Sequence, residues 1–267
     1  MKDKIQLYSK GVFLYTAPKD KKCWKEQINF INSLPNVNHV EVWIEESLNR
    51  SEINFLKSLL KNYNVLIHGP FVHLSLISPH QEVREITIKR YLQTLKVAKI
   101  LGAKLVTLHA GTKIKFLSQK QAIKILIPSL RKLRKNYKGK IPFTIENLPT
   151  ESGGVRDHYP ASLKDLSYLK KLLPWLNFTV DIGHAFQSRE NLDKISNFLR
   201  KYKNSVLDIH LHDATLNREA HLALGKGELN LDKFFRLLKE INYNNYVSLE
   251  TVTKEDTYNS WKKIIKV

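Results

Sequence analysis

Several features that would define other classes of protein are missing from this sequence. A single cysteine, Cys23, excludes any intrachain disulfide and is typical of a reducing cytoplasm. No apolar run approaches the roughly 20 residues that a membrane-spanning helix needs, and the opening MKDKIQLYSK is too polar for a secretory signal. No linker rich in glycine, proline or serine interrupts the chain. We therefore expect a cytoplasmic globular protein without a membrane partner, folded as one domain over residues 1–267.

Acidic residues are scarce, and in one segment they are missing altogether. The 267 residues include 44 lysines and arginines against 25 aspartates and glutamates, which gives a formal net charge of +19. Residues 86–145 contain 15 lysines and arginines and no acidic residue. Such a segment can bind phosphate backbones or anionic membranes, or it can form the solvated surface of helices. The 42% of hydrophobic residues excludes a disordered chain.

Short apolar runs alternate with longer segments of helical period. Strands are expected at 5–9, 39–44, 65–68, 104–109, 141–146, 177–181, 206–210 and 246–250, and helices at 21–34, 50–62, 82–103, 117–135, 160–173, 190–202, 230–242 and 255–265. Ser118 is a plausible N-cap for the fourth helix. This strict alternation over such a length predicts a closed (β/α)8 TIM barrel. A doubly wound sheet is the alternative, but no Gly-x-Gly-x-x-Gly follows the first strand.

Ionisable residues end six consecutive expected strands: His68, His109, Glu146, Asp181, His210 and Glu250. In a parallel barrel the carboxyl ends of the strands meet on one face, where catalytic residues sit. Three carboxylates that converge there repel one another unless a cation or a proton compensates. Mixed nitrogen and oxygen donors suit zinc, manganese, iron or cobalt better than magnesium or calcium. The series therefore predicts a divalent-metal site.

Other polar residues lie close to these strand ends. His184 follows Asp181 by three residues, a spacing that turns it back towards the same face, and His221 lies on the next long loop. Each is expected to bind either the metal or the substrate. His212 and Asp213 lie one step further into their loop and are expected to support the ligands. The remaining histidines are interpreted as surface or loop residues: His39, His73, His80 and His158.

These motifs resemble those of the xylose-isomerase-like TIM-barrel superfamily, which contains sugar and sugar-phosphate isomerases and epimerases as well as endonuclease IV. The resemblance covers nearly the whole chain. Its landmarks are VLIHGPF (65–71), LGAKLVTLHAG (101–111), FTIENLP (143–149), VDIGHAF (180–186), IHLHDA (209–214), HLALGKGELNLDKFF (221–235) and YVSLET (246–251). Together they are specific for the superfamily and weak for its individual members.

The epimerase branch implies one metal held by four residues: Glu146, Asp181, His210 and Glu250. The two glutamates then also transfer protons, and the substrate is a small sugar or sugar phosphate. Its hydroxyls or phosphate would be bound by His184, His221 and Lys226. The motif ENLP, in place of an ENTAG-like sequence, and DIGH, where endonuclease IV usually has a cysteine before the histidine, favour this branch. We therefore expect a metal-dependent isomerase or epimerase that uses zinc, manganese or cobalt.

The endonuclease IV branch implies instead a cluster of three zinc ions that cuts DNA at abasic sites. The further ligands of that cluster match His68, His109, His184, Glu219 and His221, where Glu219 stands in place of an aspartate. This phosphodiesterase is the alternative function. The two branches together span one to three metal ions per chain.

The basic segment 86–145 covers two of the expected helices, 82–103 and 117–135. In a barrel their polar faces form the outer ring, away from the active face. We therefore interpret most of this charge as solvated surface and keep nucleic-acid binding as the alternative. Lys113, Lys115 and Lys226 are exceptions, because they lie on loops of the active face.

Overall fold

The strands close into a parallel barrel. The computed structural model describes residues 8–150, 156–216 and 220–266. Within these residues eight parallel strands join in the closed order β1-β10-β9-β8-β6-β4-β3-β2. Their bounds are β1 (Ser9–Tyr15), β2 (His39–Trp43), β3 (Asn64–His68), β4 (Val106–Leu108), β6 (Phe143–Glu146), β8 (Asn177–Asp181), β9 (Val206–Leu211) and β10 (Tyr246–Leu249). The prediction of a (β/α)8 TIM barrel is confirmed.

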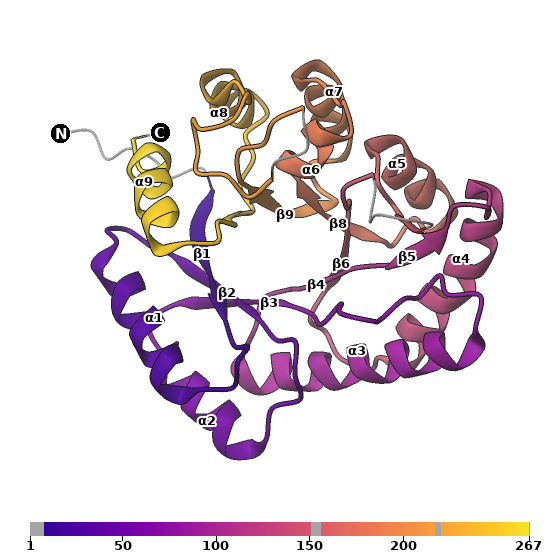
Figure 1. The fold of residues 1–267 in the computed structure, drawn as a ribbon, viewed down its shortest axis with the longest axis horizontal. Coiled ribbons are helices and arrows are strands. Elements are labelled where there is room, and N and C mark those ends of the chain that lie inside the picture. The colour runs from indigo at the N-terminus through magenta and orange to yellow at the C-terminus, as the bar shows by residue number, and fades with distance from the viewer. Residues whose placement is uncertain (1–7, 151–155, 217–219, 267) are drawn as a thin grey trace.

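Helices surround the barrel (Figure 1). They are α1 (Lys21–Ser33), α2 (Arg50–Leu59), α3 (Gln81–Leu101), α4 (Gln119–Asn136), α5 (Leu163–Leu172), α6 (Ile182–Gln187), α7 (Leu192–Tyr202), α8 (Leu231–Glu240) and α9 (Lys254–Ile264). Each longer helix follows a strand and runs back along the outside of the barrel, so it begins near the rim where the strands end. No helix among the described residues is long and apolar enough to cross a membrane.

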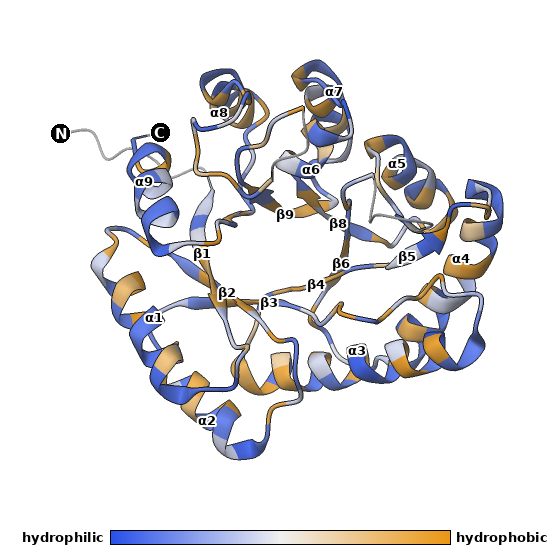
Figure 2. Cartoon of the chain, viewed as in Figure 1, coloured by the Kyte–Doolittle hydropathy of each residue, from blue (hydrophilic) through white to orange (hydrophobic). Residues whose placement is uncertain are grey.

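One stripe of each helix packs on the strands, and the other side is polar (Figure 2). In α4 the buried residues recur every three or four positions, as in Ala122, Leu126, Leu130 and Leu133. Ser118 accepts a hydrogen bond from the Gln121 backbone and forms a capping box with its side chain, which confirms Ser118 as the N-cap. The apolar core therefore lies between strands and helices, and the polar strand ends are left for the site.

Two parts of the chain differ from the sequence prediction. The first strand was expected at 5–9, but residues 1–7 lie outside the described part, and β1 runs over Ser9–Tyr15 instead. It pairs with β10 over Ser9–Val12 and with β2 over Gly11–Tyr15, and this is what closes the barrel. The helix α6 and an antiparallel pair, β5 (Thr112–Ile114) and β7 (Arg156–His158), were not predicted. These elements are too short for periodicity to detect.

Candidate metal centre

The six ionisable residues predicted at strand ends meet in one ring at the carboxyl end of the barrel. His68, Glu146 and Asp181 are the last residues of β3, β6 and β8. His210 lies in β9, where the strand register sets it directly beside Asp181. His109 and Glu250 directly follow β4 and β10. The ring is largely withdrawn from water: Glu146 is 1% exposed, and Asp181 and His210 are fully buried.

Glu146 is at the centre of this ring. Its Oε2 lies 3.3 Å from His68 Nε2 and 3.0 Å from His109 Nε2, and its Oε1 lies 3.2 Å from His210 Nδ1. Burial alone would raise the pKa of the carboxyl, but the neighbouring His210 and His109 rings outweigh it and hold the pKa well below its usual value. Glu146 is therefore ionised at neutral pH, and each of its oxygens faces a different set of nitrogen donors.

Four residues supply a compact donor set for one divalent cation. Their ligand atoms lie within 4.8 Å of one another, and the residues are Glu146, Asp181, His210 and Glu250. Glu250 Oε2 is buried and lies 3.2 Å from His210 Nδ1, yet it accepts no hydrogen bond. A buried carboxylate oxygen that accepts no hydrogen bond is costly unless positive charge nearby compensates it. This oxygen and the mixed donor set fit a metal such as zinc, manganese or cobalt.

A second group of donors consists of histidines. His184, His212 and His221 also bring their ring nitrogens within 4.8 Å of one another. His212 is fully buried, and its Nε2 lies 3.1 Å from Asp181 Oδ2. Burial lowers the pKa of His212, but the Asp181 carboxylate outweighs it and raises the pKa to about 9. His212 therefore supports Asp181, as the sequence predicted, and also joins a cluster that the sequence did not predict.

Two further site predictions are not brought into the ring. Glu219 lies outside the described residues. Lys226 is exposed on the loop before α8, and its ammonium has no hydrogen bond or ion pair with any described residue of the ring. Lys113, another basic residue of the active face, pairs with Asp157 at 3.0 Å across the β5–β7 ribbon. The role of Lys226 in binding phosphate stays a prediction.

Two buried carboxyl groups inside the barrel, Glu41 and Asp208, support His210, and the sequence did not predict them. His210 Nε2 lies 3.1 Å from Oε2 of Glu41, which belongs to β2. Burial and the adjacent Glu41 raise the pKa of Asp208 well above its usual value, so Asp208 keeps its proton and donates a hydrogen bond to Glu41. Ser248 Oγ donates to Asp208 Oδ2 at 2.9 Å. Nε2 of His210 therefore faces the ionised carboxylate of Glu41. Its Nδ1 faces Glu146 and Glu250.

The interpretation of His39 as a surface or loop residue is wrong. His39 is the first residue of β2 and is fully buried, and its Nε2 lies 3.0 Å from Ser248 Oγ. The polar residues of HVEVW (39–43) alternate with valines, and DIHLH (208–212) has the same period of two. In a barrel strand this period sends alternate side chains to the interior. That signal identifies His39, Glu41 and Asp208 as interior residues.

Aromatic side chains form a wall beside the ring. The Phe71 ring stacks on His109 with centroids 4.5 Å apart and on Trp43 with centroids 5.2 Å apart. Tyr15 meets the Trp43 ring edge-on at 5.5 Å. These rings are half-buried and come from β1, β2 and the segment after β3. Next to the ionisable residues of the candidate metal centre, such a wall suits a ligand with one apolar face and several polar groups.

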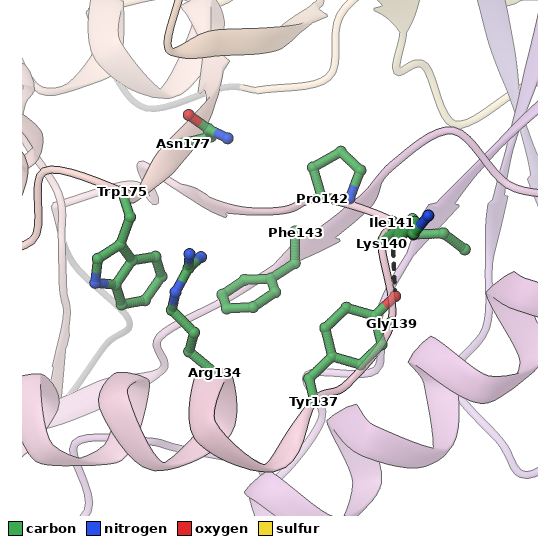
Figure 3. Close-up of a pocket in the computed structure, with 9 residues that line it drawn as sticks. All are labelled: Arg134, Tyr137, Gly139, Lys140, Ile141, Pro142, Phe143, Trp175 and Asn177. Atoms are coloured by element: carbon green, nitrogen blue, oxygen red, sulfur yellow. Dashed lines mark hydrogen bonds between the residues drawn. The ribbon is translucent and has the colours of Figure 1, made fainter.

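A separate cavity of about 400 Å³ lies at the opposite end of the barrel (Figure 3). Phe143 and Asn177, which line it, are the first residues of β6 and β8, whereas the ring uses the last residues of these strands. The Arg134 guanidinium stacks 4.5 Å above the Trp175 ring. This cavity is therefore remote from the candidate metal centre.

The chain belongs to the xylose isomerase-like TIM barrel family, whose profile matches residues 31–266. The uncharacterized protein MJ1614 of Methanocaldococcus jannaschii is 29% identical over 223 residues, which cover 82% of this chain and 84% of that protein. A probable endonuclease 4 of Aquifex aeolicus is 25% identical over 247 residues, which cover 87% and 84%.

Solved structures from both branches of the family share this fold. A D-tagatose 3-epimerase-like protein superposes with a TM-score of 0.79 at 22% identity and covers 97% of this chain and 96% of its own. Endonuclease IV from Thermus thermophilus superposes with a TM-score of 0.68 at 18% identity and covers 96% and 99%. The solved structures that share this fold thus include a D-tagatose 3-epimerase-like protein and an endonuclease IV.

Proposed function

We propose that this protein is a divalent-metal-dependent isomerase or epimerase of a small sugar or sugar phosphate. In this proposal it moves a proton at the carbon next to the carbonyl of the substrate. The observation that carries the proposal is the four-residue donor set of Glu146, Asp181, His210 and Glu250, in which one buried carboxylate oxygen accepts no hydrogen bond. All four residues belong to the described part of the chain, so the proposal does not depend on Glu219.

The two glutamates of this set are the proposed proton-transfer groups. A cation held by the set would polarise the carbonyl and the adjacent hydroxyl of the substrate and make the proton between them more acidic. Glu146 Oε1 and Glu250 Oε2 each lie 3.2 Å from His210 Nδ1. Burial raises the pKa of Glu250, but His210 outweighs it and lowers the pKa, so Glu250 is ionised like Glu146. One glutamate takes the proton, and in an epimerase the other returns a proton to the opposite face.

The surroundings of the set suit a sugar. His184 and His221 flank it as donors for hydroxyl groups, while the wall of Tyr15, Trp43 and Phe71 offers aromatic faces for the C–H side of the ring. The fold similarity to a D-tagatose 3-epimerase-like protein supports ketoses as the first substrates to test. Lys226 is the proposed contact for a phosphate group.

Deuterium exchange tests the proposal directly. Protein loaded with manganese, cobalt or zinc is incubated in D2O with a panel of ketoses and ketose phosphates, and incorporation is followed by NMR. We expect deuterium at the carbon next to the carbonyl of at least one substrate, and we expect Glu146→Gln and Glu250→Gln to abolish it. If no sugar of the panel exchanges although the protein has bound metal, the proposal is wrong.

A zinc-dependent phosphodiesterase that cuts DNA at abasic sites is the second candidate. It is favoured by the donors on the far side of Glu146, where His68 and His109 both contact Oε2, and by the cluster of His184, His212 and His221. These residues suit further metal ions that activate water and stabilise a leaving oxygen. The probable endonuclease 4 among the relatives supports it. Nicking of an abasic duplex that a chelator abolishes and zinc restores would put this function first.

A further inference from the structure

A groove lies between α4 and α5 on the outside of the barrel, and two lysines of the basic segment line it. Its volume is about 580 Å³, and its lining includes Lys120 and Lys124 from α4 and Lys164, Tyr168 and Lys171 from α5. We infer that this groove binds single-stranded nucleic acid. The lysines would contact phosphates, and the ring of Tyr168 would stack on a base. The inference does not depend on which reaction the metal centre catalyses.

The lysines form two regular rows that face one groove. On α4 the two lysines are four residues apart, and on α5 Lys164, Tyr168 and Lys171 are spaced by four and three residues. Residues at these spacings lie on one side of a helix. The row on α5 extends over about 10 Å of the helix axis at 1.5 Å per residue. A chain of phosphates that follows the groove would therefore meet ammonium groups from both walls.

These ammonium groups have no acidic partner in the described part of the chain. All four lysines are exposed, and none forms an ion pair with a described residue. Helices α4 and α5 contain a single carboxylate, Asp165, which is buried. Asp165 accepts hydrogen bonds from Gln119 and from the backbone of Ala161 and Ser162, so it caps α5 rather than neutralising the groove. The positive field of the groove is therefore available to an anionic partner.

The shape and the aromatic residue favour nucleic acid over a membrane surface. Lysines on a concave wall can line a thin polyanion, whereas a lipid surface needs a flat or convex face. Tyr168 is 45% exposed between two lysines of its row, and an aromatic ring between cations is what single-stranded nucleic-acid sites use to stack bases. A purely acidic peptide would have no use for that ring.

One end of the groove lies near the active face of the barrel. Helices α4 and α5 begin at the rim where the strands end, so Lys120 and Lys164, in their first turns, lie nearest that rim (Figure 1). The segment just before α4 adds Lys115 and Phe116, which is 87% exposed. A single strand of nucleic acid bound in the groove would therefore run from the rim down the outer wall of the barrel.

Salt-dependent binding tests the inference. The probe is a fluorescein-labelled oligothymidylate of about 20 nucleotides, and anisotropy is measured with the metal-loaded full chain over a range of NaCl concentrations. Each phosphate contact on a single strand contributes about 0.7 to the slope of log K against log salt. Replacing the four lysines by glutamine (Lys120→Gln, Lys124→Gln, Lys164→Gln and Lys171→Gln) should therefore remove up to about 3 from that slope.

A matched variant removes the same charge elsewhere: Lys22→Gln, Lys25→Gln, Lys57→Gln and Lys61→Gln on and next to α1 and α2, across the barrel in Figure 1. It should keep the slope of the parent. Tyr168→Ala should weaken binding by about fivefold or more without changing the slope, because it removes stacking but no charge, and Tyr168→Phe should restore it. Circular dichroism confirms that each variant is folded.

Three results would overturn the inference. The first is that the parent shows no saturable binding at low salt. The second is that the α1–α2 variant loses as much of the salt slope as the groove variant. The third is that Tyr168→Ala binds like the parent while polyglutamate or phosphatidylserine vesicles compete as well as oligothymidylate. The last result would assign the groove to another polyanion.

Discussion

The ring at the barrel mouth and the groove between α4 and α5 use ionisable groups in opposite ways. In the ring, carboxylates and histidines are buried, and nearly every polar atom has a defined partner, as Glu146 has with three histidines. In the groove, lysines are exposed and have no described acidic partner. The ring depends on exact positions in a low dielectric, whereas the groove depends on summed charge. Substitution of a single charged residue should therefore matter in the ring, whereas several lysines must be replaced together to change the charge effect of the groove.

The largest effect is expected from Glu146→Gln, which keeps the size of the side chain but removes its charge and its basic oxygen. Loss of acid/base function alone typically reduces turnover about 10²–10⁴-fold, and loss of a metal ligand should add to this. The rise in melting temperature on adding metal should shrink, because that rise measures metal affinity for the folded state. A variant that binds metal as tightly as the parent would contradict the assignment of Glu146.

The next effect concerns His212 and pH. Because its pKa rises from 6.5 to about 9 on folding, the charged ring should stabilise the metal-free fold fully below about pH 6.5. This stabilisation should disappear as the pH rises through about 9, and it amounts to about 3 kcal/mol at most, at 1.36 kcal/mol per pKa unit.

Urea unfolding in the presence of a chelator measures this effect. The difference in unfolding free energy between the parent and His212→Asn should be largest near pH 6 and should shrink by about 3 kcal/mol above pH 9. A difference that stays constant over this range would mean that the His212–Asp181 pair does not depend on charge.

A smaller effect should follow from Glu41→Gln, which removes the ionised acceptor of His210 without touching the four-residue donor set. Loss of such a supporting carboxylate typically costs about 10–100-fold in metal affinity. Thr107→Val is the control, because Thr107 is also buried inside the barrel but bonds only to Thr179 among the described side chains. Calorimetric titration with metal compares the two variants, and equal affinities would rule out a positioning role for Glu41.

The smallest effect is on the stability of the groove variant. Replacing its four exposed lysines by glutamine should change the unfolding free energy by no more than about 0.5 kcal/mol per site, as for most surface positions. Urea unfolding measures it. A large loss would show that the lysines are held in structural contacts, and the contrast between groove and ring would fail.

The sequence predicted the barrel and the ring for the same reason. Alternating strand and helix patterns set the closed topology, and once strands are parallel their last residues must meet, so His68 and Glu250 could be assigned to one site although they are far apart in the chain. The parts of the site that the sequence did not predict depend on side-chain packing inside the barrel. Glu41 lies in the middle of β2, so its position gives no sign of a role at the strand ends. The position of Lys226 and the stacking of Phe71 on Trp43 depend on loop conformations that periodicity does not determine.

The central claim is that Glu146, Asp181, His210 and Glu250 hold one metal ion for proton transfer. Elemental analysis of protein loaded with metal and freed of excess ion tests it most directly, because it needs no substrate. We predict about one manganese, cobalt or zinc ion per chain, absent from Glu146→Gln. Protein that binds no metal, or nearly three zinc ions per chain, would contradict the claim, and the second result would support the phosphodiesterase instead.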